Sequence, residues 1–111
     1  MSLDVYLTEV KETEIYNDNC THNLTRMANA ADLYYPLWRP DDLFPDDLEV
    51  RAAMLISRIE AGLTILKADP IYFKQFNPDN GWGDYEGLVE FTENYLQACK
   101  DNPEAIVRAD R

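Results

Sequence analysis

The sequence predicts a single α+β domain over residues 1–111, in which a small antiparallel sheet is covered on one face by three helices, in the order β-β-α-α-α-β. The first observation is an alternation of apolar and polar residues at the N-terminus, which is typical of a half-buried strand. The second is a set of apolar stripes with helical spacing in the middle and in the last third of the chain. The third is a short β-favourable segment near the C-terminus, which can add a third strand to the N-terminal hairpin.

The strands are expected at the two ends of the chain. They are predicted over residues 2–10, 13–17 and 105–108. In the first of them Leu3, Val5 and Leu7 share one face, which we expect to be buried. Lys11 and Glu12 are the expected hairpin connection, although they lack the Gly or Asn that tight hairpin turns favour.

The first helix is expected to follow a polar turn. Residues 17–21 are rich in Asn, Asp and Thr, which predicts a turn and a helix N-cap. The helix should end at Tyr35, because helices usually stop before a proline and Pro36 follows. Trp38 and Arg39 are therefore expected in extended or turn structure.

The second helix, over about 47–68, has two apolar stripes. The main stripe is Leu48, Ala52, Leu55, Ile59, Leu63 and Leu66, and the weaker one is Val50, Met54, Ala61 and Ile65. A helix that is apolar on two sides is either sandwiched between other elements or offers one side to a partner. We expect the sandwich.

The last helix, over about 84–100, is preceded by a short helical turn after Pro70 and by a loop that contains glycine, proline and Asx residues. The loop and helix start, Phe76 to Leu88, read FNPDNGWGDYEGL and surround Trp82 with three of the four glycines. Such a composition requires a specific backbone path. Two readings stay open: a structural turn whose indole closes the core, or a polar or anionic ligand site at the helix N-terminus.

Composition limits the function. Against 21 carboxylates the chain has only 10 Lys and Arg, a net charge of −11, which argues against direct binding of nucleic acid or of an anionic membrane. Without an apolar run long enough for a membrane span, we expect a cytoplasmic protein. Cys20 and Cys99 are then expected as free thiols. A single histidine, His22, and no zinc-type spacing predict neither a metal nor a cofactor.

Polar and aromatic residues at the expected turns form the candidate ligand site. They are His22, Arg26, Trp38, Arg39, Asn80 and Trp82. Loops often carry function, and Arg and Trp dominate binding hot spots. A continuous first helix would separate His22 from Trp38 by about 20 Å at 1.5 Å per residue. If the first and last helices run parallel, His22 and Trp82 should meet, and if they run antiparallel, Trp38 and Arg39 should meet Trp82. We favour the second group, because short connections favour antiparallel neighbours.

Three phrases of the chain carry a resemblance. THNLTRMANAADLYYPLWRP, FNPDNGWGDYEGLVEFTENYLQAC and the opening MSLDVYL resemble a family of small, uncharacterised proteins encoded by phages and prophages. The resemblance covers most of the chain. It implies a setting, the cytoplasm of a bacterial host, and no mechanism or catalytic residue.

Three hypotheses follow. The first is a non-catalytic intracellular binding protein that captures a small ligand or a host partner at the Trp/Arg/glycine-loop surface. The second is an acidic decoy that blocks a basic nucleic-acid-binding host protein through Glu86, Glu90, Glu93 and the acidic segment from Asp41 to Glu49. The third is a small hydrolase that uses Cys20 or His22, and we rank it last because no orienting third group is recognisable. Oligomeric state is left open.

Overall fold

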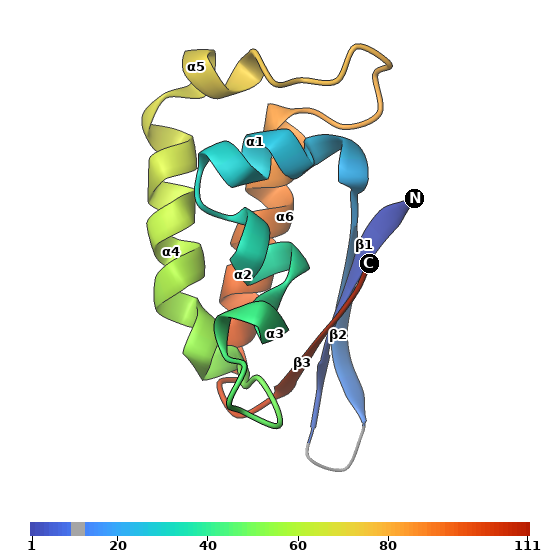
Figure 1. Cartoon of the computed structure of the whole chain (residues 1–111), viewed down its shortest axis with the longest axis vertical. Helices are drawn as coiled ribbons and strands as arrows, with labels where there is room; N and C mark the ends of the chain where they lie inside the picture. Colours follow the sequence, from blue (N-terminus) through green and yellow to red (C-terminus); the bar gives the residue numbers. More distant parts are fainter. Residues whose placement is uncertain (10–12) are drawn as a thin grey trace.

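Within residues 1–9 and 13–111, which the computed structural model describes, three antiparallel strands form one open sheet in the order β2-β1-β3 (Figure 1). The strands are β1 Ser2–Thr8, β2 Glu14–Thr21 and β3 Ile106–Asp110. The predicted C-terminal strand therefore joins the N-terminal hairpin, with Arg108 opposite Tyr6 of β1. The expected connection at Lys11 and Glu12 lies outside the described residues.

Strand β2 is longer than predicted and includes the segment that we expected to be a turn. The expected helix cap is present at its last residue, where the Thr21 hydroxyl accepts the Asn23 N–H at 3.3 Å. Ser2 of β1 pairs with Thr21, so the ladder continues to the end of β2. On the outer face of the sheet, Asn19 Nδ2 donates to Ser2 Oγ and to Asp4 Oδ1, each at 2.7 Å. Ladder pairing and these side-chain bonds outweigh the turn preference of the Asn and Asp residues.

The helices form the second layer, on one side of the sheet (Figure 1). They are α1 Thr25–Ala30, α2 Tyr34–Trp38, α3 Pro40–Leu43, α4 Ala52–Ala68, α5 Pro70–Lys74 and α6 Tyr85–Asp101, with a 3-10 turn at His22–Leu24. The α+β class is confirmed, but the helical layer is divided into more and shorter elements than we predicted. Leu3, Val5 and Leu7 of β1 are fully buried beneath this layer, as expected from their alternation.

The predicted first helix is broken at Asp32, which has a positive φ of 60°. Aspartate tolerates this left-handed conformation better than most residues, so the chain can reverse between α1 and α2. Pro36 is the third residue of α2 and does not terminate a helix. The first turn of a helix needs no intrahelical acceptor for its N–H groups, so a proline fits there. Trp38 is consequently helical and not extended.

Helix α4 begins at Ala52, five residues later than predicted. Arg51 bridges to Ile106 and the Val107 N–H donates to the Val50 carbonyl at 2.8 Å, so this segment follows the sheet before the helix starts. Leu48 is therefore not part of the buried stripe and is fully exposed. The rest of the main stripe is buried as predicted.

The second stripe is sandwiched only in part, which corrects our expectation: Val50 is buried and Met54 is half-buried. Ala61 and Ile65 are exposed to solvent. On its other side α4 packs antiparallel to α6 (Figure 1), and the pairs Lys67–Glu93 at 3.0 Å and Lys100–Glu60 at 2.8 Å join the two helices. The outer side of α4 is thus left for another contact.

Helix α6 confirms the prediction most closely. Asp84 is its N-cap, and Asp84 Oδ1 accepts the Gly87 N–H at 2.7 Å. Cys99 on α6 and Cys20 on β2 are buried free thiols, as predicted. Among the described residues, each helix is too short or too polar to cross a lipid bilayer.

Candidate functional site

Trp38 lies in the core, and its indole N–H is bonded to His22. The side chain is 1% exposed, and its Nε1 donates to His22 Nδ1 at 2.8 Å. The expected separation of about 20 Å is wrong, because it assumed one continuous helix and the chain reverses at Asp32. Tyr34 stacks on the indole with ring centroids 6.1 Å apart. In this position Trp38 supports the site from within and offers no face to a ligand.

Arg39 is held by its neighbours. Its Nε donates to the Tyr34 hydroxyl at 3.1 Å, and its guanidinium forms an ion pair with Asp42 at 3.4 Å. The Asp42 contact was anticipated by the sequence, whereas the Tyr34 contact was not. Through this bond Arg39 fixes the orientation of an aromatic ring that lies between the core and the surface.

Trp82 and Asn80 lie in a separate place. Trp82 is 71% exposed, its N–H donates to Asn80 Oδ1 at 2.9 Å, and its carbonyl accepts from Asn23 Nδ2 at 3.4 Å. The glycine loop therefore contacts the segment next to His22. The expected group of Trp38, Arg39 and Trp82 is not formed as one exposed surface, because Trp38 is buried.

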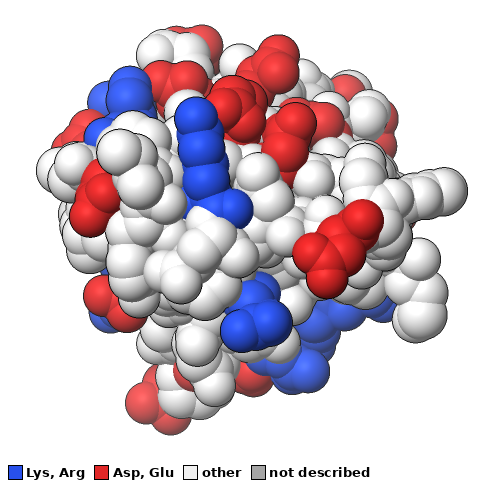
Figure 2. All heavy atoms as spheres, turned by 90° about the horizontal axis from the view of Figure 1, so that it is seen from above, with Lys and Arg blue, Asp and Glu red and all other residues white. Residues whose placement is uncertain are grey.

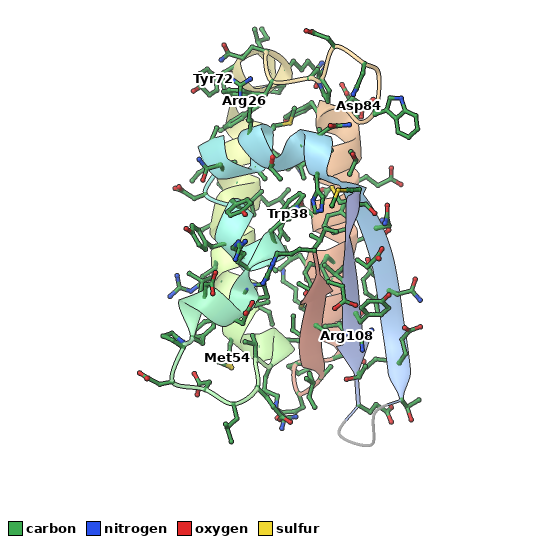
Figure 3. All side chains as sticks on the ribbon, turned by 45° about the vertical axis from the view of Figure 1, so that its right-hand side comes forward. Arg26, Trp38, Met54, Tyr72, Asp84 and Arg108 are labelled. Carbon is green, nitrogen blue, oxygen red and sulfur yellow. The ribbon has the colours of Figure 1, made fainter. Side chains whose placement is uncertain are left out.

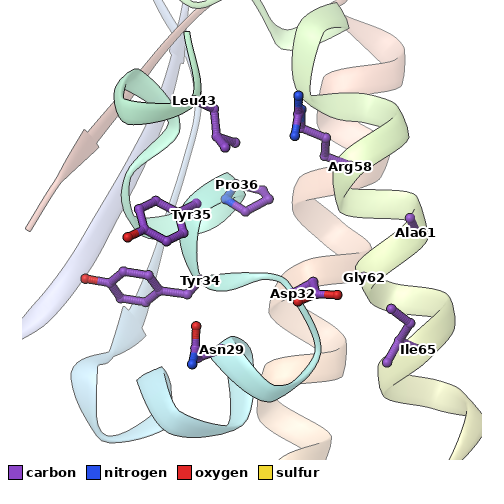
Figure 4. Close-up of a pocket in the computed structure, with 10 residues that line it drawn as sticks. All are labelled: Asn29, Asp32, Tyr34, Tyr35, Pro36, Leu43, Arg58, Ala61, Gly62 and Ile65. Carbon is purple, nitrogen blue, oxygen red and sulfur yellow. The ribbon is translucent and has the colours of Figure 1, made fainter. Parts of the chain in front are cut away.

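A groove lies between α2 and α4, beside Tyr34, the residue that bonds Arg39 and stacks on Trp38 (Figure 4). Its volume is about 400 Å³, and its lining residues are Asn29, Asp32, Tyr34, Tyr35, Pro36, Leu43, Arg58, Ala61, Gly62 and Ile65. A second hollow of about 340 Å³, lined by Thr25, Arg26, Asn29, Tyr34 and Tyr35, shares three of these residues. We call the two together the tyrosine groove.

Close packing at one point defines the tyrosine groove. A Cβ on Gly62 would lie 2.5 Å from Leu33 Cδ2 and 3.0 Å from the Ala31 carbonyl oxygen. The turn between α1 and α2 therefore rests directly on α4 at the one position that has no side chain. On the surface beside this contact, Tyr35 and Ile65 stay partly exposed and do not close over each other. Figure 4 shows Ala61 and Ile65 on α4 across the hollow from the two tyrosines.

Two arginines of the tyrosine groove have no acidic partner. The Arg26 guanidinium lies 5.7 Å from the Phe76 ring centroid, and that of Arg58 lies 5.3 Å from the Phe44 ring centroid. Within the part of the chain that the structure describes, neither is within ion-pair distance of a carboxylate. The other arginines, Arg39, Arg51, Arg108 and Arg111, each have a carboxylate partner at 2.9 to 3.4 Å. Arg58 lines the hollow of about 400 Å³ and Arg26 the hollow of about 340 Å³, so each hollow contributes one such guanidinium group in a chain of net charge −11.

Of the predicted site residues, Arg26 lines the tyrosine groove and Arg39 supports it through Tyr34. Arg58, Tyr35 and Ile65 were missed as site residues. The second apolar stripe of α4 was the signal that could have identified this side of the helix. Because a sandwich would have buried it, we did not assign it to a ligand.

Comparison of the chain with protein-family models, with curated proteins and with solved structures gives no match. Among the described residues, no three His, Cys, Asp or Glu side chains are grouped so that they could hold a metal ion. A functional assignment therefore rests on the chemistry of the tyrosine groove and of the surfaces around it.

Proposed function

We propose that this chain is a non-catalytic binding protein that captures a small anionic ligand with a planar ring in the tyrosine groove. The observation that carries the proposal is that each of the two adjoining hollows has an arginine without a carboxylate partner among the described residues, Arg58 in one and Arg26 in the other, and that Tyr35 lines both. A volume of about 400 Å³ lies within the range of small-molecule sites. The resemblance to phage- and prophage-encoded proteins adds a proposed setting, the cytoplasm of a bacterial host, where such a protein could sequester a host signal.

The chemistry of the groove suits this ligand class. A guanidinium binds carboxylate or phosphate oxygens with two parallel hydrogen bonds, and charge-assisted bonds of this kind are stronger than neutral ones. Tyr35 is 48% exposed and can stack on a planar ring, while Ala61 and Ile65 offer apolar contact on the opposite wall. Asp32 also lines the groove and disfavours anions near it, so the charged end of the ligand should lie toward an arginine.

The decoy alternative receives less support. Of the carboxylates that it needs, Asp41, Asp42, Glu49, Glu86 and Glu93 each lie within 3.4 Å of a lysine or arginine nitrogen. Ion pairs with the protein's own cations leave less negative charge for a basic groove on a partner. The two hypotheses also differ in salt dependence, since a decoy complex should weaken steeply as ionic strength rises.

The hydrolase alternative has a similar weakness. Burial raises the pKa of the Cys20 thiol to about 12, so the thiol is neutral at physiological pH and is a poor nucleophile. His22 Nδ1 already accepts the Trp38 indole N–H. We therefore assign no catalytic residue and expect no cofactor.

The test is a calorimetric titration with adenosine 5′-monophosphate, phenyl phosphate and benzoate, with uncharged adenosine as the matched ligand. We expect at least one of the anions to bind and adenosine not to bind. Arg58→Gln or Arg26→Gln should then weaken binding by about 10- to 100-fold, because a hydrogen bond to a charged group contributes about 1.5–3 kcal/mol.

The matched control is Arg108→Gln, which removes one arginine from the outer face of the sheet, where it lies 4.3 Å from the Tyr6 ring centroid. It should leave the affinity unchanged. Binding of none of the three anions at concentrations up to about 1 mM, or an equal loss in all three variants, contradicts the proposal.

A further inference from the structure

Trp82 is presented to solvent by a loop with a defined backbone. Large apolar side chains are usually at least partly buried, yet this indole is 71% exposed. The loop positions it through the positive φ angles of Gly81 and Gly83, 75° and 104°, and through the bond from the Trp82 N–H to Asn80. A side chain on a preorganised loop loses little conformational entropy when it binds, and Trp is enriched among binding hot spots.

Both ends of the loop are anchored to the fold. Gly83 packs so closely that a Cβ there would lie 2.7 Å from Thr21 Cγ2. Before the glycines, Asn77 Oδ1 accepts the Tyr85 N–H at 2.9 Å, and after them Asp84 caps α6. The exposure of Trp82 is therefore built into the fold.

The surroundings of Trp82 are acidic. Asp79 and Asp84 are exposed on either side of it in the loop, and among the described residues neither forms an ion pair. The nearby Glu86, by contrast, is paired with Lys74 at 3.2 Å. Figure 2, which looks onto this end of the molecule, shows uncharged surface reaching the right-hand margin, with an acidic side chain beside it and basic side chains below it. The whole chain adds a net charge of −11, which attracts cations from solution.

We propose that Trp82, Asp79 and Asp84 form a docking surface for an arginine- or lysine-bearing segment of a partner protein. A cationic side chain of that segment lies over the face of the indole, where the cation–π attraction is strongest for Trp. Its neighbours of the same charge pair with Asp79 and Asp84. Charge complementarity selects this partner, and the proposal does not depend on the tyrosine groove.

The experiment is a selection from a displayed library of random twelve-residue peptides, run in parallel on the wild-type chain and on the Trp82→Ala variant. We expect wild type to enrich arginine- or lysine-containing peptides that the variant does not retain. Synthetic copies of these peptides should lose at least about tenfold in affinity on Trp82→Ala. The double variant Asp79→Asn/Asp84→Asn should weaken them severalfold and flatten their salt dependence.

The variants are chosen to keep the fold. Trp82 is exposed, and asparagine at position 84 remains a good N-cap. Ile71→Ala is the control, since Ile71 is an exposed apolar residue on α5 outside the loop, and it should leave peptide affinity unchanged. The proposal is overturned if no selected peptide depends on Trp82, or if the dependent peptides are neutral or acidic. It is also overturned if sedimentation shows a dimer that Trp82→Ala dissociates, because the occupant is then a second copy of the chain.

Discussion

At the scale of single residues, the two tryptophans show how the environment decides the role of a side chain. Trp38 finds an acceptor for its N–H in His22 and a stacking partner in Tyr34, so it can be buried without an unsatisfied donor. Trp82 has its backbone fixed by Asn80 and Asn23, while its ring is left outside. Tryptophan as a residue type predicted a hot spot at both positions, and only the exposed one remains available.

The thiols give a prediction at the same scale. Burial raises the pKa of Cys20 and of Cys99 to about 12, from a value near 9 for an unperturbed thiol. A raised pKa means that the folded state holds the proton more tightly. The thiols therefore contribute stability that is complete below about pH 9 and is lost as pH rises toward 12.

Urea unfolding should show this as a fall in the free energy of unfolding between pH 8 and pH 10 of about 1 kcal/mol for each thiol. Cys99→Ala should make the fall smaller. Alkylation in urea without reductant, followed by mass spectrometry, should add two groups because both thiols are free. A stability that does not change from pH 8 to pH 10 contradicts the assignment.

At the scale of elements, the conformation of the junctions between helices determined how the helices are arranged. Asp32 adopts a left-handed conformation and Pro36 lies in the first turn of a helix, so one expected helix becomes α1 and α2 with a reversal between them. The turn between them then rests on Gly62 of α4. This contact produces both the burial of Leu33 and the hollow beside it.

Gly62→Ala tests that contact. In an ordinary helix interior the substitution is stabilising by up to about 1 kcal/mol. Here the new methyl group would lie 2.5 Å from Cδ2 and 2.6 Å from Cγ of Leu33, which is fully buried. We expect a loss of about 1–3 kcal/mol in the free energy of unfolding, as in other overpacked cores.

The compensating variant makes the result specific. In a Leu33→Ala background the same Gly62→Ala change should cost much less, because the overlapping Leu33 atoms are gone and only the Ala31 carbonyl oxygen, at 3.0 Å, stays close. Chemical denaturation of the four proteins in this cycle gives the coupling energy between the two positions. Additive effects would show that α4 does not meet the turn as described.

At the scale of the whole molecule, the tyrosine groove and the Trp82 loop belong to different parts of the fold. The groove lies between α2 and α4, and the loop leads into the start of α6, which packs against the other side of α4 (Figure 1). Figure 3 gives a second view, in which Arg26 and Asp84 lie on separate helices near the same end of the molecule. The two surfaces share no lining residue.

We therefore expect the two binding events to be independent. Trp82→Ala should leave the affinity of the groove for its anion unchanged, and Arg58→Gln should leave the affinity of the loop for its basic peptide unchanged. In the double variant, the binding free energy of each ligand should equal that of the corresponding single variant within about 0.5 kcal/mol, as is usual for distant sites. Calorimetry with each ligand in the presence of the other measures this directly, and a larger coupling would mean that the helices transmit a change between the sites.

The sequence by itself determined the fold class, because that class depends on local periodicity. Alternation in β1 and the apolar stripes of α4 and α6 are properties of neighbouring residues, and a strand or helix with one apolar face must bury it. The start of the last helix near residue 84 and the free thiols were also predicted from the sequence. The extent of β2 was not, because its register depends on β1.

Only the tertiary structure decided which residues share a surface. His22 meets Trp38 because of one left-handed residue, and Ala61 and Ile65 of α4 stay exposed beside the contact at Gly62. Arg58 of α4 and Arg26 of α1 line the two hollows of the tyrosine groove from different helices. Such proximity depends on where the chain turns and how closely its elements pack. A turn can depend on the conformation of one residue, which local composition does not fix.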